Sequence, residues 1–96
     1  MKTLLTTPAF DAWFEGLRDK MTARRIQARL DRVEDGNFGD CRAIAEGVME
    51  LRIHHGPGYR IYFTQRRENI VVLLAGGSKS TQQQDIDTAL ATAREL

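Results

Sequence analysis

The residues best suited to chemistry gather between Leu51 and Phe63, where the chain reads LRIHHGPGYRIYF. This stretch holds two arginines, two histidines and two tyrosines around a Gly-Pro-Gly turn, and it holds no acidic residue. Arginine binds phosphate through paired hydrogen bonds, histidine exchanges protons near neutral pH, and tyrosine can stack on an unpaired base. The composition therefore favours a site for a phosphate-rich substrate.

The alternation of polar and apolar residues predicts two strands that flank this turn. Successive side chains of a strand point to opposite faces, and residues on adjacent strands lie within reach of one another. We expect one face to pack on helices through Leu51, Ile53, Ile61 and Phe63. We expect the other face to be open to solvent and to carry Arg52, His54, Arg60 and Tyr62. Lys79, in the sequence GGSKS that ends the next strand, is expected on the same concave surface.

Each of these residues also has a structural interpretation. Arg60 can form an ion pair with Glu50, Tyr62 can be a half-exposed sheet residue, and histidines beside a turn are often inert. The functional interpretation is favoured for the set as a whole, because the stretch contains no acid that would neutralise it.

Other chemistries lack the required residues. The sequence GGSKS does not have the spacing of a phosphate-binding P-loop. His54 and His55 are consecutive, so on a strand they point to opposite faces and cannot hold one metal ion together. The single cysteine, Cys41, forms neither a disulfide nor a zinc knuckle. We therefore expect no metal, no cofactor and no covalent intermediate.

The length and composition bound the kind of protein. The 96 residues are enough for one hydrophobic core, so residues 1–96 are expected to form a single domain. With 42% hydrophobic and 28% charged residues, the chain resembles a globular protein. It has one thiol, no visible signal peptide and no apolar run near the ~20 residues that cross a bilayer, so a cytoplasmic location is expected.

The net charge of +1 conceals a local cluster of basic residues. Between Arg18 and Arg32 there are six basic residues and two acidic ones. Clustered positive charge attracts anionic partners even when the total charge is small, although such a helix face can also be merely solvated. The sequence leaves these two interpretations open.

Periodicity predicts the elements that must position the site. The first helix should start at Pro8, capped by Thr7, and carry an apolar stripe as far as Met21. A second helix should follow, and a last helix should begin with the capping box formed by Ser80 and Gln83. The expected ranges are a strand at 2–6, a helix at 23–34 capped by Thr22, strands at 41–47, 48–54, 59–65 and 69–76, and the C-terminal helix. This order predicts an α+β fold: an antiparallel sheet of three to five strands with an N-terminal helical hairpin and a C-terminal helix.

Three stretches, residues 10–40, 47–66 and 70–96, resemble the RelE/ParE toxin superfamily, and in particular the HigB-like addiction module killer proteins found in phage-related genes. The most specific pieces are ELRIHHGPGYRIYF and LLAGGSKSTQQQDI. The resemblance implies a RelE-like fold and a type II toxin encoded beside a cognate antitoxin, usually with a helix-turn-helix domain. Contact with DNA would then occur only through the antitoxin complex.

RelE-like and HigB-like members cleave messenger RNA on the ribosome without a metal ion and so inhibit translation, whereas ParE-like members poison DNA gyrase. The resemblance therefore implies an endoribonuclease. The alternatives are a gyrase inhibitor without catalytic activity and an inactive toxin that acts as a co-repressor with its antitoxin.

The resemblance also suggests roles for single residues. Arg60 matches the arginine of the family's G-Y-R strand, Lys79 matches the basic residue at the end of the last strand, and Arg52 matches a basic position on the preceding strand. The chain lacks the family's paired lysines, and residues 80–96 lack the tyrosine that RelE carries.

The expected reaction is attack of a 2′-hydroxyl on the adjacent phosphate. Arg60 and Lys79 would stabilise the developing charge, and Arg52 would grip phosphate. A histidine, His54 or His55, would transfer the proton. Tyr59 or Tyr62 would hold a base.

Overall fold

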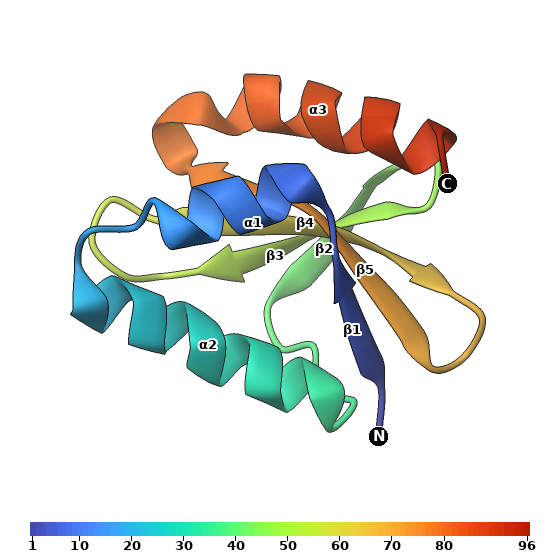
Figure 1. The fold of residues 1–96 in the computed structure, drawn as a ribbon, viewed down its shortest axis with the longest axis horizontal. Coiled ribbons are helices and arrows are strands. Elements are labelled where there is room, and N and C mark those ends of the chain that lie inside the picture. The colour runs from blue at the N-terminus through green and yellow to red at the C-terminus, as the bar shows by residue number, and fades with distance from the viewer.

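The computed structural model describes all 96 residues as five strands and three helices (Figure 1). The elements are β1 (Thr3–Thr6), α1 (Pro8–Glu15), α2 (Lys20–Glu34), β2 (Cys41–Ala45), β3 (Val48–Ile53), β4 (Tyr59–Arg66), β5 (Ile70–Ser78) and α3 (Gln82–Arg94). A single 3-10 turn, Lys79–Thr81, joins β5 to α3. The predicted α+β class, the pair of N-terminal helices and the C-terminal helix are confirmed, and the arrangement is consistent with a RelE-like fold.

The five strands form one sheet in the order β1-β5-β4-β3-β2. Strands β2 to β5 form the expected antiparallel meander, because the connections between them are too short for any other arrangement. The sheet is nevertheless mixed, since β1 pairs parallel with β5, with Leu4 opposite Val71. No short turn links β1 to β5, so nothing local forces that pair to be antiparallel.

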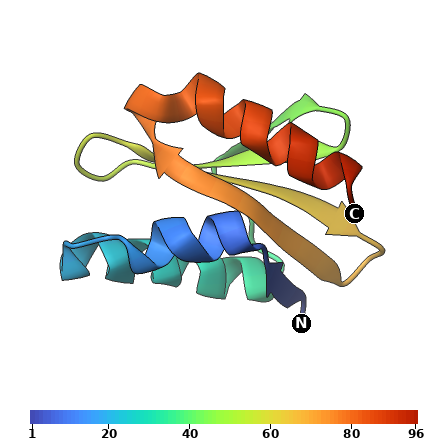
Figure 2. The same cartoon turned by 45° about the horizontal axis from the view of Figure 1, so that its top comes forward.

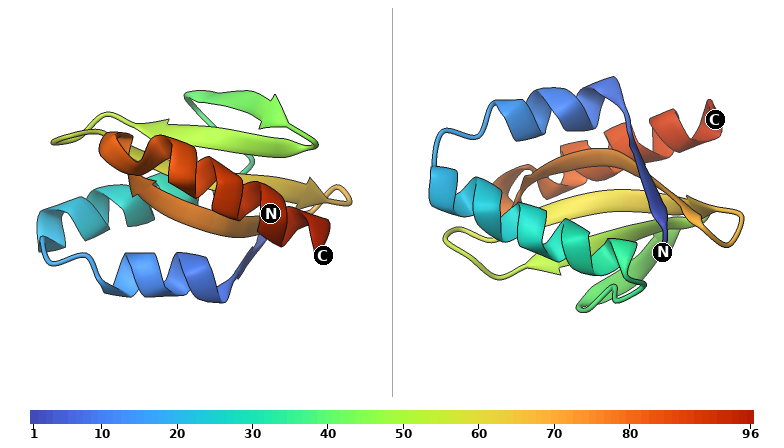
Figure 3. Two further views of the ribbon diagram at one scale, coloured as in Figure 1. Left: turned by 90° about the horizontal axis from the view of Figure 1, so that it is seen from above. Right: turned by 60° about the horizontal axis from the view of Figure 1, so that its bottom comes forward.

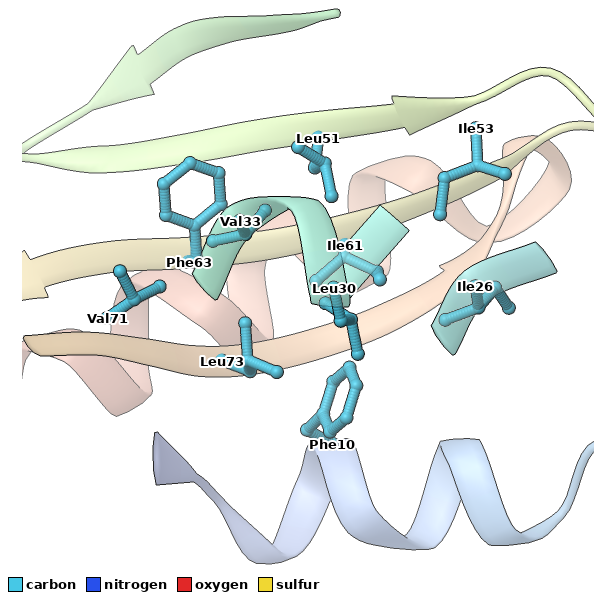
Figure 4. Close-up of a cluster of buried hydrophobic side chains, with 10 residues drawn as sticks. All are labelled: Phe10, Ile26, Leu30, Val33, Leu51, Ile53, Ile61, Phe63, Val71 and Leu73. Carbon is cyan, nitrogen blue, oxygen red and sulfur yellow. The ribbon is translucent and has the colours of Figure 1, made fainter. Parts of the chain in front are cut away.

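Helices cover both faces of the sheet. Figure 2 shows α1 and α2 below the strands and α3 above them, and the views in Figure 3 agree. The larger core lies between the sheet and the first two helices (Figure 4). Its members are Phe10, Ile26, Leu30, Val33, Leu51, Ile53, Ile61, Phe63, Val71 and Leu73. The predicted apolar face of β3 and β4 is therefore confirmed.

The second core corrects the expectation of an open polar face. Helix α3 lies across that face, and its Ala89 packs there with side chains of β3, β4 and β5. The buried members are Val48, Tyr62, Val72, Leu74, Ala75 and Ala89. The end of the face near the β3–β4 turn stays accessible, as does the edge strand β2, where about half of the Arg42 side chain is exposed.

The boundary between the first two helices differs from the prediction. Helix α1 ends before Gly16, and α2 begins at Lys20 with Asp19 as its N-cap. The Asp19 carboxylate accepts hydrogen bonds from the Met21 amide at 3.1 Å and from the Thr22 hydroxyl at 2.9 Å. Aspartate is among the best N-capping residues, which explains why the helix starts one turn earlier than periodicity suggested. Met21 consequently points to solvent.

The predicted capping box of the last helix is also absent. Helix α3 starts at Gln82, after the 3-10 turn, and has no side-chain cap. The Ser80 hydroxyl instead bonds that of Ser78 at 2.7 Å, and the Thr81 hydroxyl donates to Asp85 at 2.5 Å. The predicted cap of α1 is confirmed, because the Thr7 hydroxyl accepts from the Phe10 amide at 3.2 Å.

Two adjacent glycines in β5 let a helix approach closely from each face. A Cβ atom on Gly76 would overlap the indole of Trp13 in α1, and one on Gly77 would overlap the carboxylate of Asp85 in α3. These positions require glycine for lack of space, because neither has a positive φ. The pair therefore sets how closely α1 and the start of α3 pack on the sheet.

We expect Gly76→Ala to lower the free energy of unfolding by about 1–3 kcal/mol, because the new methyl group displaces Trp13. Urea denaturation of the single variants and of the Gly76→Ala/Trp13→Leu double variant measures the effect. The methyl group should cost less when leucine replaces the indole. An unchanged unfolding midpoint for Gly76→Ala would contradict this account of the packing.

Candidate functional site

The β3–β4 turn, the end of β5 and the start of α3 lie at the same end of the molecule (Figures 1 and 3). A cleft of about 330 Å³ opens there, and its lining is mostly polar. Four basic side chains border it: His54, His55, Arg60 and Lys79. The structure thus brings together all four residues for which a catalytic role was predicted.

The backbone of the turn fixes the two sides of the cleft relative to each other. The Lys79 amide donates to the Gly58 carbonyl at 2.9 Å, and the strand register places Arg60 opposite Gly77. Gly56 and Gly58 have φ values of 56° and 88°, a region that side chains other than glycine disfavour. The Gly-Pro-Gly sequence therefore allows the tight turn that holds Lys79 against it.

Arg60 is mostly buried beside the cleft, with 12% of its side chain exposed. Its Nε atom is buried and has no hydrogen-bond partner, and the side chain makes no hydrogen bond within the protein. The nearest acid is Glu50, whose Oε2 atom lies 4.0 Å from Nε. The terminal nitrogens also have no partner within the protein, and because Arg60 lines the cleft they can donate to an anion that enters it.

Glu50 is the functional-site neighbour that sequence reasoning misplaced. The sequence suggested it only as an ion-pair partner of Arg60, on a face expected to be open; it does lie at ion-pair distance from Arg60, but its side chain is fully buried under α3. Oε1 accepts from Arg42 Nε at 2.9 Å, and Oε2 accepts from Tyr62 at 3.1 Å and from Gln82 at 2.8 Å. Burial by itself would raise the pKa of Glu50, but the hydrogen bonds from Gln82, Arg42 and Tyr62 outweigh it and hold the pKa below its usual value.

Tyr62 lies beneath α3 with no exposed surface, which contradicts its expected place on an open face. Burial, together with the neighbouring charge of Glu50, raises the pKa of its phenol far above the usual value. Tyr62 is therefore a neutral hydrogen-bond donor to Glu50. It cannot stack on a base in this structure.

Asp40 neutralises part of the predicted cationic set. Arg52 donates to its Oδ1 atom from Nε at 3.1 Å and from a terminal nitrogen at 2.8 Å. His54 Nε2 lies 2.6 Å from the other oxygen. The hydrogen bonds from His54 and then Arg52 lower the pKa of Asp40. The expectation that no acid opposes the cluster is thus wrong, because Asp40 and Glu50 reach it from outside the 51–63 stretch.

Of the remaining two predicted residues, His55 borders the cleft and Tyr59 does not. The ring of His55 stacks on Tyr59, with centroids 6.5 Å apart and an angle of 26° between the planes. Tyr59 points to the α1 side of the sheet, where its ring lies 6.5 Å from that of Trp13, and it does not line the cleft. A base-binding role for Tyr59 therefore remains a prediction without a place in the cleft.

A second recess of about 270 Å³ adjoins the first along α2. His54 and His55 line both recesses, and Arg25 and Arg32 stand on the far side of the second. Arg29 between them is structural, since it donates to the Arg52 carbonyl at 2.6 Å and to the Phe38 carbonyl at 3.0 Å. The basic face of α2 is thus continuous with the cleft.

No three His, Cys, Asp or Glu side chains gather closely enough to hold a metal ion. No helix has the length and apolar character needed to cross a membrane.

Comparison with known proteins identifies the family. Residues 12–96 match the family described as "Phage derived protein Gp49-like (DUF891)", a range that contains every residue of the cleft. The chain therefore belongs to this Gp49-like family of phage-derived proteins. It is also 44% identical to an uncharacterized protein of Haemophilus influenzae over 91 aligned residues. The alignment covers 95% of this chain and 92% of that protein.

The lowered pKa of Glu50 predicts how stability depends on pH. As the pH falls through about 4.3, the unfolded chain protonates this carboxylate before the folded protein does, so Glu50 stabilises the fold above that pH. We expect the unfolding free energy of the wild type to exceed that of Glu50→Gln most at pH 6–7, by an amount that shrinks below about pH 4. Urea denaturation across this pH range measures the difference, with Glu15→Gln, an exposed acid without an ion pair, as control. A difference that does not vary with pH would contradict the assignment.

Proposed function

We propose that this protein is the toxin of a type II toxin–antitoxin system and that its cleft is the active site of a metal-independent endoribonuclease. The observation that carries the proposal is the cleft itself, which gathers Arg60, Lys79 and two histidines around a mostly polar space. Membership of the Gp49-like family and the resemblance to HigB-like toxins support it. The protein would inhibit translation by cutting messenger RNA held on the ribosome.

The reaction needs only groups that line this cleft. The ribose 2′-oxygen of the RNA attacks the adjacent phosphorus, a new P–O2′ bond forms, and the P–O5′ bond breaks. A 2′,3′-cyclic phosphate and a free 5′-hydroxyl result. Arg60 and Lys79 stabilise the charge that grows on the phosphate oxygens. The guanidinium of Arg60 suits this role because it is largely shielded from solvent. The attraction between its charge and a phosphate is stronger where water is excluded.

Of the two histidines, His54 is the better candidate for the proton acceptor. If Nε2 carries the proton donated to Asp40 at 2.6 Å, the other ring nitrogen, Nδ1, is left with a free lone pair. Asp40 thus has the role of an orienting acid, which keeps the imidazole in one tautomer. His55, at the rim beside it, is the candidate for returning a proton to the departing 5′-oxygen.

The partners in this proposal are messenger RNA on the ribosome and a cognate antitoxin. A polyanionic strand would be drawn to the cleft and to the adjoining basic face of α2. An antitoxin segment rich in acidic or apolar residues, laid across the cleft, would block access of RNA to Arg60 and Lys79.

We expect brief expression of the chain to produce new 5′ ends in cellular messenger RNA. Arg60→Ala should reduce this cleavage by about 100-fold or more, because one preorganised charge-stabilising group is lost. Arg66→Ala is the matched control, since Arg66 lies on the same strand but is exposed at its opposite end. Equal cleavage by the Arg60 and Arg66 variants would remove Arg60 from the active site.

We expect His54→Ala to lower the cleavage rate by about 10²–10⁴-fold, as for loss of a general base, and His55→Ala to lower it less. Asp40→Asn should give a smaller loss than His54→Ala, because the imidazole remains and only its orienting partner is weakened. Single-turnover cleavage of a short RNA between pH 5 and 9 measures all three. Growth arrest that survives in every histidine variant, without RNA cuts, would instead favour a non-catalytic gyrase inhibitor.

A further inference from the structure

Behind the cleft, the buried carboxylate of Glu50 faces the guanidinium of Arg60. The two groups do not form a hydrogen bond, because Glu50 Oε2 lies 4.0 Å from Arg60 Nε. Oε2 is already occupied by donors from Tyr62 and Gln82, and Oε1 is occupied by Arg42. The carboxylate is therefore fixed in place by three other side chains and attracts Arg60 through space.

The attraction to Glu50 constrains the orientation of the Arg60 guanidinium. The Nε atom of Arg60 is the one buried side-chain polar atom of the protein that lacks a partner, and it lies on the Glu50 side. The guanidinium is planar, so fixing Nε toward the carboxylate also fixes the orientation of the two terminal nitrogens. Those nitrogens have no partner within the protein, and the side chain lines the cleft.

The same carboxylate also connects to the opposite side of the cleft. Its 2.8 Å hydrogen bond from Gln82 joins it to the first residue of α3. Gln82 follows directly after the Lys79–Thr81 turn, whose first residue borders the cleft. A shift of this bond would therefore move the segment that carries Lys79.

We propose that Glu50 is a positioning residue: its buried charge orients the guanidinium of Arg60 toward the cleft, and its bond to Gln82 holds the Lys79 turn opposite. The effect on catalysis rests on the ribonuclease function proposed above. The orientation of Arg60 does not, so the two ideas can fail separately.

A positioning role and a purely electrostatic effect predict different kinetics for Glu50→Gln. Glu50→Gln keeps the size of the side chain but removes a negative charge about 4 Å from the phosphate-binding arginine. By charge alone, RNA should bind as tightly or more tightly. If Glu50 positions Arg60, however, the geometry needed in the transition state is lost and turnover falls, because misplacement of about 1 Å can cost about 100-fold.

The first experiment compares the wild type, Glu50→Gln and Glu46→Gln on a short RNA. Glu46 is the matched control, because it too tethers α3, through a 2.7 Å ion pair with Arg94, but lies outside the cleft. We expect kcat of Glu50→Gln to fall by about 10–100-fold with KM unchanged or lower, and both constants of Glu46→Gln to be unchanged. Unchanged kcat in Glu50→Gln, or a rise in KM alone, would overturn the proposal.

The second measurement does not depend on cleavage. In the ¹H–¹⁵N NMR spectrum of the wild type, the Nε–H group of Arg60, assigned with Arg60→Lys, should exchange slowly with solvent because it is buried. In Glu50→Gln this resonance should shift and exchange faster, while a 2′-O-methyl RNA that cannot be cut still binds. An unaltered resonance would overturn the proposal.

The outcomes keep the two ideas apart. If the wild type cuts no RNA but the Arg60 resonance responds to Glu50→Gln, the ribonuclease function fails and the positioning role stands. If Glu50→Gln proves too unstable to purify, Gln82→Ala keeps the buried charge and removes only the link to α3. Its kcat should also fall, and an unchanged kcat would overturn the part of the proposal that concerns Lys79.

Discussion

A carboxylate that leaves water must find hydrogen-bond donors inside the protein, and Glu50 finds them on β2, β4 and α3. Breaking such a buried network is costly, because each partner removed leaves an unpaired polar group. The network therefore ties α3 to the sheet at the place where α3 begins. The cleft lies at this junction, so the side chains that line it depend on a residue that does not touch solvent.

Close packing on both faces of β5 supports the same junction. Gly76 and Gly77 offer no side chain, so Trp13 settles on one face and Asp85 on the other. Helix α3 then shields Glu50 and Tyr62, and most of Arg60, from water. Electrostatic attraction is stronger where water is excluded, so the carboxylate of Glu50 can orient the guanidinium of Arg60 across 4.0 Å. A flatter, more open sheet with the same residues would lose this effect.

The charges around the cleft are balanced unevenly. Arg52 and His54 share Asp40, whereas Arg60 and Lys79 have no hydrogen-bonded acid. Under the proposed function, an entering phosphate would meet two cations without hydrogen-bonded partners, Arg60 oriented by Glu50 at 4.0 Å and Lys79, and a histidine held by Asp40. This distribution of charge suits the proposed reaction, in which the 2′-oxygen of the RNA is the nucleophile. Such a reaction requires the protein only to stabilise charge, position the substrate and transfer protons.

Much of this protein is determined by local sequence. The alternation in β3 and β4 predicted the buried face, the short turns predicted the meander, and Thr7 with Pro8 marked the start of α1, because these features depend on neighbouring residues. The catalytic candidates His54, His55, Arg60 and Lys79 also came from the sequence, partly through the family resemblance. Which face α3 would cover was decided only in the tertiary structure. Packing of α3 over β4 buried Glu50 and Tyr62, and the loop before β2 delivered Asp40 to Arg52 and His54. Period-2 patterning cannot anticipate either event, since it assigns residues to faces but does not say what will cover each face.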